Sequence, residues 1–209
     1  MFDPAHVITT VEQLRAVTAP PRAAQQTKVV GTLDDHGRRW IGRSPFVVIA
    51  SVDATGRMDV SPKGDPPGFV RILDASTIAI PDRPGNRRLD TFENVIQNPR
   101  VAVMFMVPGR GEVLRVGGNA QIVTEPSLMN EMVVAGRPPA MALVVNIDEV
   151  MFHCGKSVIR SKLWSPDEWA SVDGLASYAQ ILADQTEADE TVEQMETRFA
   201  TWHDGKELY

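Results

Sequence analysis

Cysteine is almost absent from the sequence, because Cys154 is the only one among 209 residues. A single cysteine excludes an internal disulfide and a metal site built from several thiolates. Long apolar runs are also missing: the longest, such as residues 101–107, are far shorter than the roughly 20 residues that span a bilayer. The first residues lack the basic and apolar stretches of a secretory signal peptide. These absences predict a cytoplasmic protein with no membrane partner.

A broad excess of positive charge is missing too, since 21 basic residues face 27 acidic ones and the net charge is −6. Residues 184–209 carry this excess, with eight acidic side chains against Arg198 and Lys206. An acidic protein gives no reason to expect general affinity for nucleic acid. The rest of the chain is balanced, so its local basic clusters can be interpreted individually.

Short apolar and β-branched segments at hairpin spacing dominate the middle of the chain. We predict strands at residues 44–53, 57–64, 68–74, 76–82, 101–107, 112–125 and 142–154. Only one helix of any length separates them, whereas a doubly wound parallel sheet would need a helix after nearly every strand. The pattern predicts a mainly β fold with flanking helices (α+β), built as an antiparallel barrel.

Three local expectations accompany this fold. Residues 101–107 are apolar on both strand faces, which predicts a strand buried on both sides. The helix that closes on Asn98–Pro99 carries Leu89, Phe92, Val95 and Ile96 on one face, which predicts its buried stripe. Cys154 is expected to be a small buried residue.

Helical patterns flank the predicted barrel on both sides. Residues 10–30 read as two short helices broken by Pro20–Pro21, and the last thirty residues hold two more. We therefore divide the chain into an N-terminal helical segment (1–43), the barrel (44–164) and a C-terminal helical appendage (165–209).

Three arginines crowd around the start of the central helix, in the stretch PDRPGNRRLD: Arg83, Arg87 and Arg88. The first turn of a helix already presents unpaired N–H groups and a partial positive charge, so cations there are unfavourable unless an anion is near. One interpretation is a phosphate site, with Gly85 allowing close backbone approach. The other is a set of surface ion pairs, which the Arg87–Asp90 spacing permits. The residues alone leave both open.

Three further groups could carry chemistry. Lys156, Arg160 and Lys162 lie in a segment without acids, which is either an anion site or a solvated basic face. SPKGD at residues 61–65, with Ser61 and Lys63 in alternating register, is either a ligand-facing strand end or an ordinary polar turn. Arg115 interrupts an apolar strand and must face solvent or a charge partner. No residue is a persuasive catalytic acid, base or nucleophile, and the four scattered histidines predict no metal site.

Taken in order, these elements resemble the pyridoxamine 5′-phosphate oxidase-like FMN-binding family. The resemblance runs through VSPKG (60–64), GFV (68–70), the arginine turn, Asn98–Pro99 and LRVGGNA (114–120). The segment FHCGKSVIRSKLW (152–164) is also similar to the end of one bacterial subgroup. The family fold is an antiparallel split β-barrel that forms a homodimer with flavin at the subunit interface.

The resemblance also implies a set of FMN-binding residues. It places four residues along the flavin ring edge and ribityl chain: Val60, Ser61, Pro62 and Lys63. It places five at the turn that holds the ribityl and the phosphate: Pro81, Asp82, Arg83, Asn86 and Arg87. Arg115 would face the ring or the phosphate. The partner subunit would contribute Lys156, Arg160, Ser161 and Lys162.

The implied activity is that of an FMN-dependent oxidoreductase in which the cofactor carries the chemistry. Three departures separate the chain from the family's oxidases, one of which is a helix about one turn longer after the arginine pair. Their arginine before the V-x-x-K pattern falls one residue early, at Arg57, and their terminal R-L-H-x-R pattern is missing. We therefore do not expect a vitamin B6 substrate. The alternatives are a deazaflavin (F420) reductase and a non-catalytic flavin- or haem-binding protein on the same fold.

Overall fold

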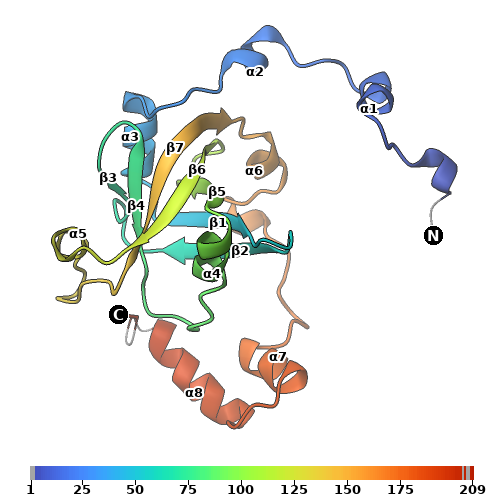
Figure 1. Cartoon of the computed structure of the whole chain (residues 1–209). Helices are drawn as coiled ribbons and strands as arrows, with labels where there is room; N and C mark the ends of the chain where they lie inside the picture. The colour runs from blue at the N-terminus through green and yellow to red at the C-terminus, as the bar shows by residue number, and fades with distance from the viewer. Residues whose placement is uncertain (1–2, 204, 206–207) are drawn as a thin grey trace.

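Seven antiparallel strands form one sheet at the centre of the computed structural model, which describes residues 3–203, 205, 208 and 209 (Figure 1). Their order across the sheet is β2-β1-β5-β6-β7-β4-β3. The strands are β1 (Phe46–Val52), β2 (Met58–Gly64), β3 (Arg71–Ile72), β4 (Thr77–Pro81), β5 (Arg100–Met106), β6 (Val113–Val123) and β7 (Ala142–His153). Every predicted strand is present, and the predicted antiparallel, mainly β fold is confirmed.

The two long strands β6 and β7 join the two ends of this sheet. β6 pairs with β5 on one side and β7 on the other, and β7 then pairs with β4. The β6–β7 register shifts between Gly117 and Gly118, a local irregularity that increases twist. As a result, β1 and β2 lie across the direction of β4 and β7 (Figure 1).

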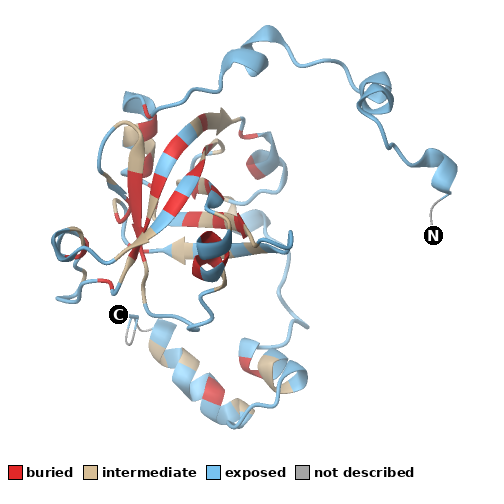
Figure 2. Ribbon diagram, in the orientation of Figure 1, coloured by how far each residue is buried: buried red, intermediate tan, exposed pale blue. Residues whose placement is uncertain are grey.

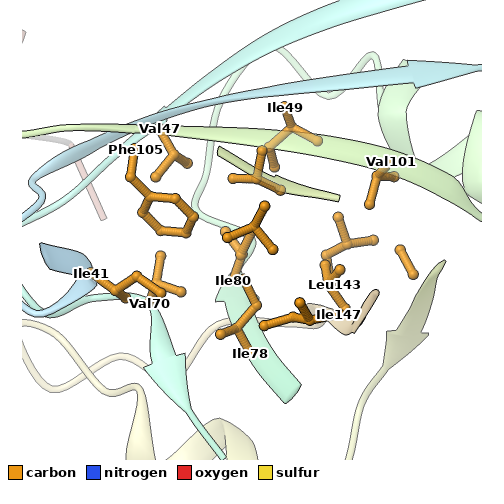
Figure 3. Close-up of a cluster of buried hydrophobic side chains, with 14 of the residues drawn as sticks. Ile41, Val47, Ile49, Val70, Ile78, Ile80, Val101, Phe105, Leu143 and Ile147 are labelled. Atoms are coloured by element: carbon orange, nitrogen blue, oxygen red, sulfur yellow. The ribbon is translucent and has the colours of Figure 1, made fainter. Parts of the chain in front are cut away.

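The core fills the space between these two halves of the sheet. Val47 and Phe105 from one half face Ile78, Ile80 and others from the second half (Figure 3). Burial is concentrated in the sheet and α4, whereas the N-terminal segment before β1 and the C-terminal helices are mostly exposed (Figure 2).

One face of β5 is buried and the other is not. Val101, Val103 and Phe105 are buried, but Ala102 is exposed, and Met104 is half-buried. The prediction that this strand is buried on both faces was therefore wrong for a single chain.

The outward residues of β5 continue an apolar surface that extends over β1 and β2. Register pairing places Phe46 beside Met106, and Ala50 between Val60 and Ala102. Met58 and Val60 are 69% and 62% exposed on the same face. We call this surface the outer sheet face: Phe46, Val48, Ala50, Val52, Met58, Val60, Pro62, Ala102, Met104 and Met106.

The helices around the sheet are mostly short. They are α1 (Val11–Val17), α2 (Ala23–Thr27), α3 (Asp35–Ile41), α4 (Asp90–Gln97), α5 (Pro126–Glu131), α6 (Lys156–Arg160), α7 (Tyr178–Gln185) and α8 (Val192–His203), with 3₁₀ turns η1 (Pro4–His6) and η2 (Pro166–Glu168). The sequence analysis missed α3, whose N-cap Asp34 accepts a hydrogen bond from Gly37 N at 2.8 Å. No described helix is long and apolar enough to cross a membrane.

Helix α4 packs with a different face from the predicted apolar stripe. Phe92 and Val95 are buried as expected, but Ile96 is 76% exposed and Leu89 lies outside the helix. Two polar side chains belong to the packed face instead. Thr91 Oγ1 donates to Asp59 Oδ2 at 2.7 Å, and Asn94 Nδ2 donates to Ser51 Oγ at 3.0 Å. Two hydrogen bonds therefore fix α4 against β1 and β2.

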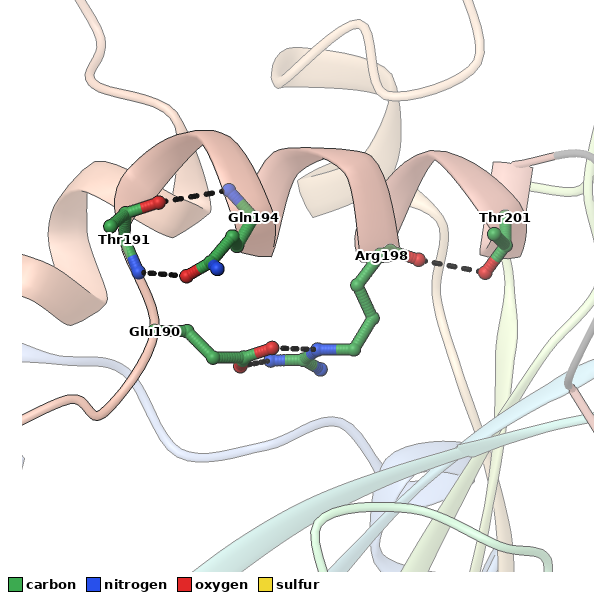
Figure 4. Close-up of polar contacts among 5 residues, drawn as sticks. All are labelled: Glu190, Thr191, Gln194, Arg198 and Thr201. Carbon is green, nitrogen blue, oxygen red and sulfur yellow. Dashed lines mark hydrogen bonds and ion pairs between the residues drawn. The ribbon is translucent and has the colours of Figure 1, made fainter.

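The C-terminal helices carry their own capping contacts. Thr191 and Gln194 exchange hydrogen bonds at the start of α8, and Arg198 pairs with Glu190 at 2.6 Å (Figure 4). The divisions proposed after residues 43 and 164 stay predictions, although β1 begins at Phe46.

Gly118 offers a sharp test of the β6–β7 irregularity. A Cβ built there would lie 2.1 Å from the Asn146 carbonyl oxygen, so Gly118→Ala must displace the backbone. We expect a loss of about 2–3 kcal/mol in the free energy of unfolding, measured by chemical denaturation. Gly31→Ala is the matched control, because its Cβ would meet no atom closer than 3.9 Å. Equal stability of the two variants would contradict the described packing.

Candidate functional site

A cavity of about 480 Å³ lies between β2, the segment that leads from β4 to α4, and the start of α4. Its volume falls within the range of about 300–1,000 Å³ typical of small-molecule sites. Eight of the predicted flavin residues line it: Val60, Ser61, Pro62, Lys63, Asp82, Arg83, Asn86 and Arg87. Pro81 lines an adjoining cavity that shares five of these residues. The structure thus brings nine predicted residues together.

Alternation along β2 decides which side chains face this region from the strand. Asp59, Ser61 and Lys63 are half-buried, whereas Val60 and Pro62 lie on the outer sheet face. Lys63 Nζ lies 3.3 Å from Asp82 Oδ1 and 5.4 Å from the centre of the Phe92 ring. Residues 61–64 therefore belong to β2 and line the cavity, so the prediction of an ordinary polar turn was wrong.

Arg83 points into the protein and is held there by two acceptors. Its Nε donates to Asp65 Oδ2 at 2.6 Å and an Nη donates to the Met132 carbonyl at 2.8 Å, and the side chain is only 13% exposed. The Asp65 side chain is completely buried. A buried charge of this kind needs both a partner and hydrogen bonds, and the pair supplies them to each other. Arg83 thus anchors the turn to the core.

Tyr209 completes this buried network. Its hydroxyl donates to Asp65 Oδ1 at 2.5 Å, and the Arg83 guanidinium lies 5.8 Å from the ring centre. The hydrogen bond to Asp65, followed by burial, raises the pKa of the Tyr209 hydroxyl. The hydroxyl is therefore held in its protonated, donating form.

The two remaining arginines of the turn behave differently. Arg88 forms two hydrogen bonds to the Asp90 carboxylate at 2.8 and 3.0 Å, which raise the pKa of Arg88 and lower that of Asp90. Arg87 makes no hydrogen bond or ion pair with any residue that the structure describes. Arg88 therefore forms a surface ion pair, whereas Arg87 is the arginine of this turn that is free, within the described chain, to bind a phosphate.

The backbone of this turn is strained. Arg87 and Leu89 both have φ of 59°, a left-handed conformation that costs a non-glycine residue roughly 1 kcal/mol or more. No side-chain hydrogen bond caps the start of α4, although Phe92 N in its first turn donates to the Leu89 carbonyl at 2.8 Å. Strain, an uncapped helix start and an uncommitted guanidinium meet at one corner of the cavity.

The other predicted residues line neither cavity within one chain. Arg115 on β6 lies 3.1 Å from His153 Nε2 and 3.6 Å from Glu149. Burial first, then the charges of Arg115 and Lys28, lower the pKa of His153. Because a guanidinium only donates, His153 Nε2 is the acceptor.

Helix α6 and the residues after it hold the rest of the predicted set. Ser161 donates to the Val158 carbonyl at 3.1 Å, and Lys162 pairs with Glu168 at 3.1 Å. Lys156 and Arg160 are exposed and have no hydrogen bond or ion pair within the described part of the chain. The predicted burial of Cys154 was wrong, since it is exposed next to α6.

Sequence reasoning missed several residues around the cavity. Asp59 could have been found, because it alternates with Ser61 and Lys63 along the same strand face. Asp65 closes the SPKGD segment, but its pairing with Arg83 gave no signal, and neither did Met141, because only the fold brings them to the turn. No group of three described His, Cys, Asp or Glu residues could hold a metal ion.

The buried pair makes a testable contribution to stability. Asp65→Asn leaves the Arg83 guanidinium buried opposite a neutral amide, so we expect a loss of about 3 kcal/mol in the free energy of unfolding. Asp90→Asn is the matched control, because it breaks a pair whose arginine is 63% exposed and should cost under about 1 kcal/mol. Urea denaturation of both variants measures the difference, and equal losses would contradict the anchoring role.

Comparison with known proteins identifies the family to which this architecture belongs. Residues 33–154 match the sequence profile of the family described as pyridoxamine 5′-phosphate oxidase. No curated protein matches the chain. Together with the antiparallel seven-stranded sheet, the profile match confirms the predicted split β-barrel.

Three solved structures show how limited the detailed similarity is. HupZ from Group A Streptococcus is 18% identical over 56% of this chain and 91% of its own, with a TM-score of 0.46. An F420 reductase is 18% identical over 58% and 98%, with a TM-score of 0.40. HutZ, the haem storage protein from Vibrio cholerae, is 15% identical over 58% and 94%, with a TM-score of 0.41. The profile, however, covers more than half of the chain, which therefore belongs to the pyridoxamine 5′-phosphate oxidase family.

Proposed function

We propose that this protein binds FMN in the 480 Å³ cavity and acts as a flavin-dependent oxidoreductase that does not use pyridoxamine phosphate. One observation carries the proposal. Arg87 is a cation without a protein partner among the described residues, beside an uncapped helix start, at the mouth of a cavity of suitable size. Family membership supplies the expectation that the missing anion is a flavin phosphate.

The chemistry of the lining fits this group. A phosphate monoester carries close to two negative charges and acceptor oxygens that suit a guanidinium and backbone N–H donors. Gly85 leaves the turn open, because a Cβ there would meet nothing closer than 3.9 Å. On β2, Ser61 and Lys63 offer a hydroxyl and an ammonium for the ribityl chain and ring edge.

In this proposal each residue of the turn has a distinct task. Arg83, fixed by Asp65, keeps the turn in place, and Arg87 with the first amides of α4 binds the phosphate. The flavin supplies hydride or electron transfer, and the protein binds and orients it. The absorbance spectrum of protein as purified, with mass identification of the released chromophore, tests the cofactor directly. If the released chromophore is a deazaflavin or a haem, the proposal that the cofactor is FMN is wrong.

We also propose a homodimer that completes this site. The outer sheet face exposes a continuous apolar surface, which is typical of a region that another protein chain covers. Lys156 and Arg160 of α6 line no part of the cavity in their own chain. A second copy on the outer sheet face gives these cations a partner, because they can then approach the neighbouring flavin.

Replacing Arg87 tests the phosphate assignment. Arg87→Ala removes charged hydrogen bonds worth about 1.5–3 kcal/mol, so we expect the Kd for FMN to rise about 10- to 100-fold. Fluorescence titration of apoprotein measures this change. Arg88→Ala is the matched control, because Arg88 is already paired with Asp90, and it should weaken binding far less. Unchanged FMN affinity in Arg87→Ala would contradict the assignment.

Mixed dimers test the shared site. Arg87→Ala and Arg160→Ala chains, each weakened in FMN binding as homodimers, are unfolded together and refolded. If the two residues act across the interface, each heterodimer has one site with both residues intact. Tag-purified heterodimers should then bind about one FMN per dimer at wild-type affinity. Heterodimers with no such site would show that both residues belong to one chain's site.

A further inference from the structure

A second cavity, of about 740 Å³, opens at the end of the barrel where α3 meets the β5–β6 turn and the end of β7. It shares no lining residue with the 480 Å³ cavity. Its principal residues are His36, Arg39, Trp40, Arg43, Arg110 and Phe152. We call it the α3 cavity.

Helical spacing brings three of these side chains to one side of α3. His36, Arg39 and Trp40 follow the i, i+3, i+4 pattern of a helix face, and Arg43 lies in the turn that follows α3, where its N–H donates to the Trp40 carbonyl at 3.1 Å. On the opposite face, Gly37 and Ile41 are buried against the barrel. The helix therefore turns its cationic and aromatic face toward the cavity and its small and aliphatic face toward the core.

Two aromatic rings form an apolar wall of the α3 cavity. The centres of Trp40 and Phe152 lie 5.3 Å apart with their planes at 83°. Both side chains are only half-buried, although both pack against the core. The Arg110 guanidinium lies over the Trp40 ring, 5.8 Å from its centre, so a cation of the lining is adjacent to this aromatic wall.

Positive charge exceeds negative charge around these rings. Arg39 is 3.9 Å from Asp35, and Arg110 is 3.2 Å from Glu112, both in exposed pairs that contribute little energy. Arg43 has no side-chain hydrogen bond or ion pair among the described residues. The lining thus holds three guanidinium groups against the single carboxylate of Glu112. An anion is the ligand that this balance favours.

The β5–β6 turn connects the α3 cavity to α6. Trp164 Nε1 donates to the Arg110 carbonyl at 2.8 Å. A Cβ on Gly155 would lie 2.8 Å from the Gly111 carbonyl carbon, so the two backbones are in direct contact. Arg110, which lines the cavity, and its neighbour Gly111 therefore contact the residues that flank α6, the helix whose cations are proposed to reach the partner's flavin.

We propose that the α3 cavity binds an aromatic anion, a planar ring that carries a phosphate or carboxylate, and that this ligand is the second substrate of the flavin centre. Its role as second substrate rests on the proposed function, whereas the binding itself does not. Trp40 and Phe152 contact the ring, and Arg43, with Arg39 and Arg110 nearby, binds the acidic group. Two sources share this chemistry: a pyridine dinucleotide electron donor and an aromatic acid.

Equilibrium titration of the protein as purified separates the two sources. NADP⁺ and salicylate are each titrated by isothermal calorimetry, since neither reduces a bound flavin. We expect saturable binding of one of them, and Arg43→Ala should weaken it at least about tenfold because a charged hydrogen bond is lost. Arg22→Ala is the matched control: it removes an exposed arginine outside the cavity and should leave the affinity unchanged.

The outcomes are distinct from those of the FMN experiments. NADP⁺ binding that depends on Arg43 identifies a dinucleotide site, and salicylate binding that depends on Arg43 identifies an aromatic acid site. Binding of neither probe, or binding that Arg43→Ala leaves unchanged, overturns the inference. Flavin-loaded protein with no anion binding contradicts this inference alone, whereas anion binding without FMN affinity contradicts the proposed function alone.

Discussion

The ion pair between Arg83 and the buried Asp65 is the contact on which the candidate flavin site depends. It joins the turn after β4 to the residue that follows β2, so the two walls of the 480 Å³ cavity are held in register. A buried pair of this kind adds little net stability but is costly to break, because either partner alone would be a buried charge. The turn is therefore confined to a narrow set of conformations, and the strained backbone at Arg87 and Leu89 can persist.

The three arginines of this turn differ in whether they already have an acidic partner. Arg83 is committed to the core and Arg88 to Asp90, whereas Arg87 has no partner within the described chain. The mutual repulsion of three guanidinium groups near a helix start is thus neutralised at two positions and left at the third. An anion at that position removes the repulsion and satisfies the first amides of α4 together.

Alternation and turn chemistry made much of this architecture predictable. The strands and hairpins follow from residues close in sequence. The approach of residues 60–63 to the arginine turn was implied by the family resemblance, and nine of the residues that it implied meet around the two adjoining cavities. The anchor was not predictable, because Asp65 and Arg83 are brought together only by the sheet. Helix α3 was missed because it is short and because Gly37 and several charges obscure its buried face.

The outer sheet face explains why the burial of β5 was mispredicted. A strand that is apolar on both faces must be covered on both, and sequence periodicity does not say whether the cover belongs to the same chain. Here β5 lies between β1 and β6, yet Met104 and Ala102 face outward beside Val48 and Ala50. A cover from a second copy accounts for the pattern without a further element in this chain.

A second copy on the outer sheet face also bears on the relation between the two cavities. Within one chain, the α3 cavity and the flavin cavity share no residue, and α6, which packs beside the former, lines no part of the latter. In the proposed dimer, α6 approaches the neighbouring flavin, and the α3 cavity that contacts α6 would then serve the other chain's cofactor. The placement of unpaired cations on α6 and beside Trp40 is thus accounted for by one arrangement of two chains.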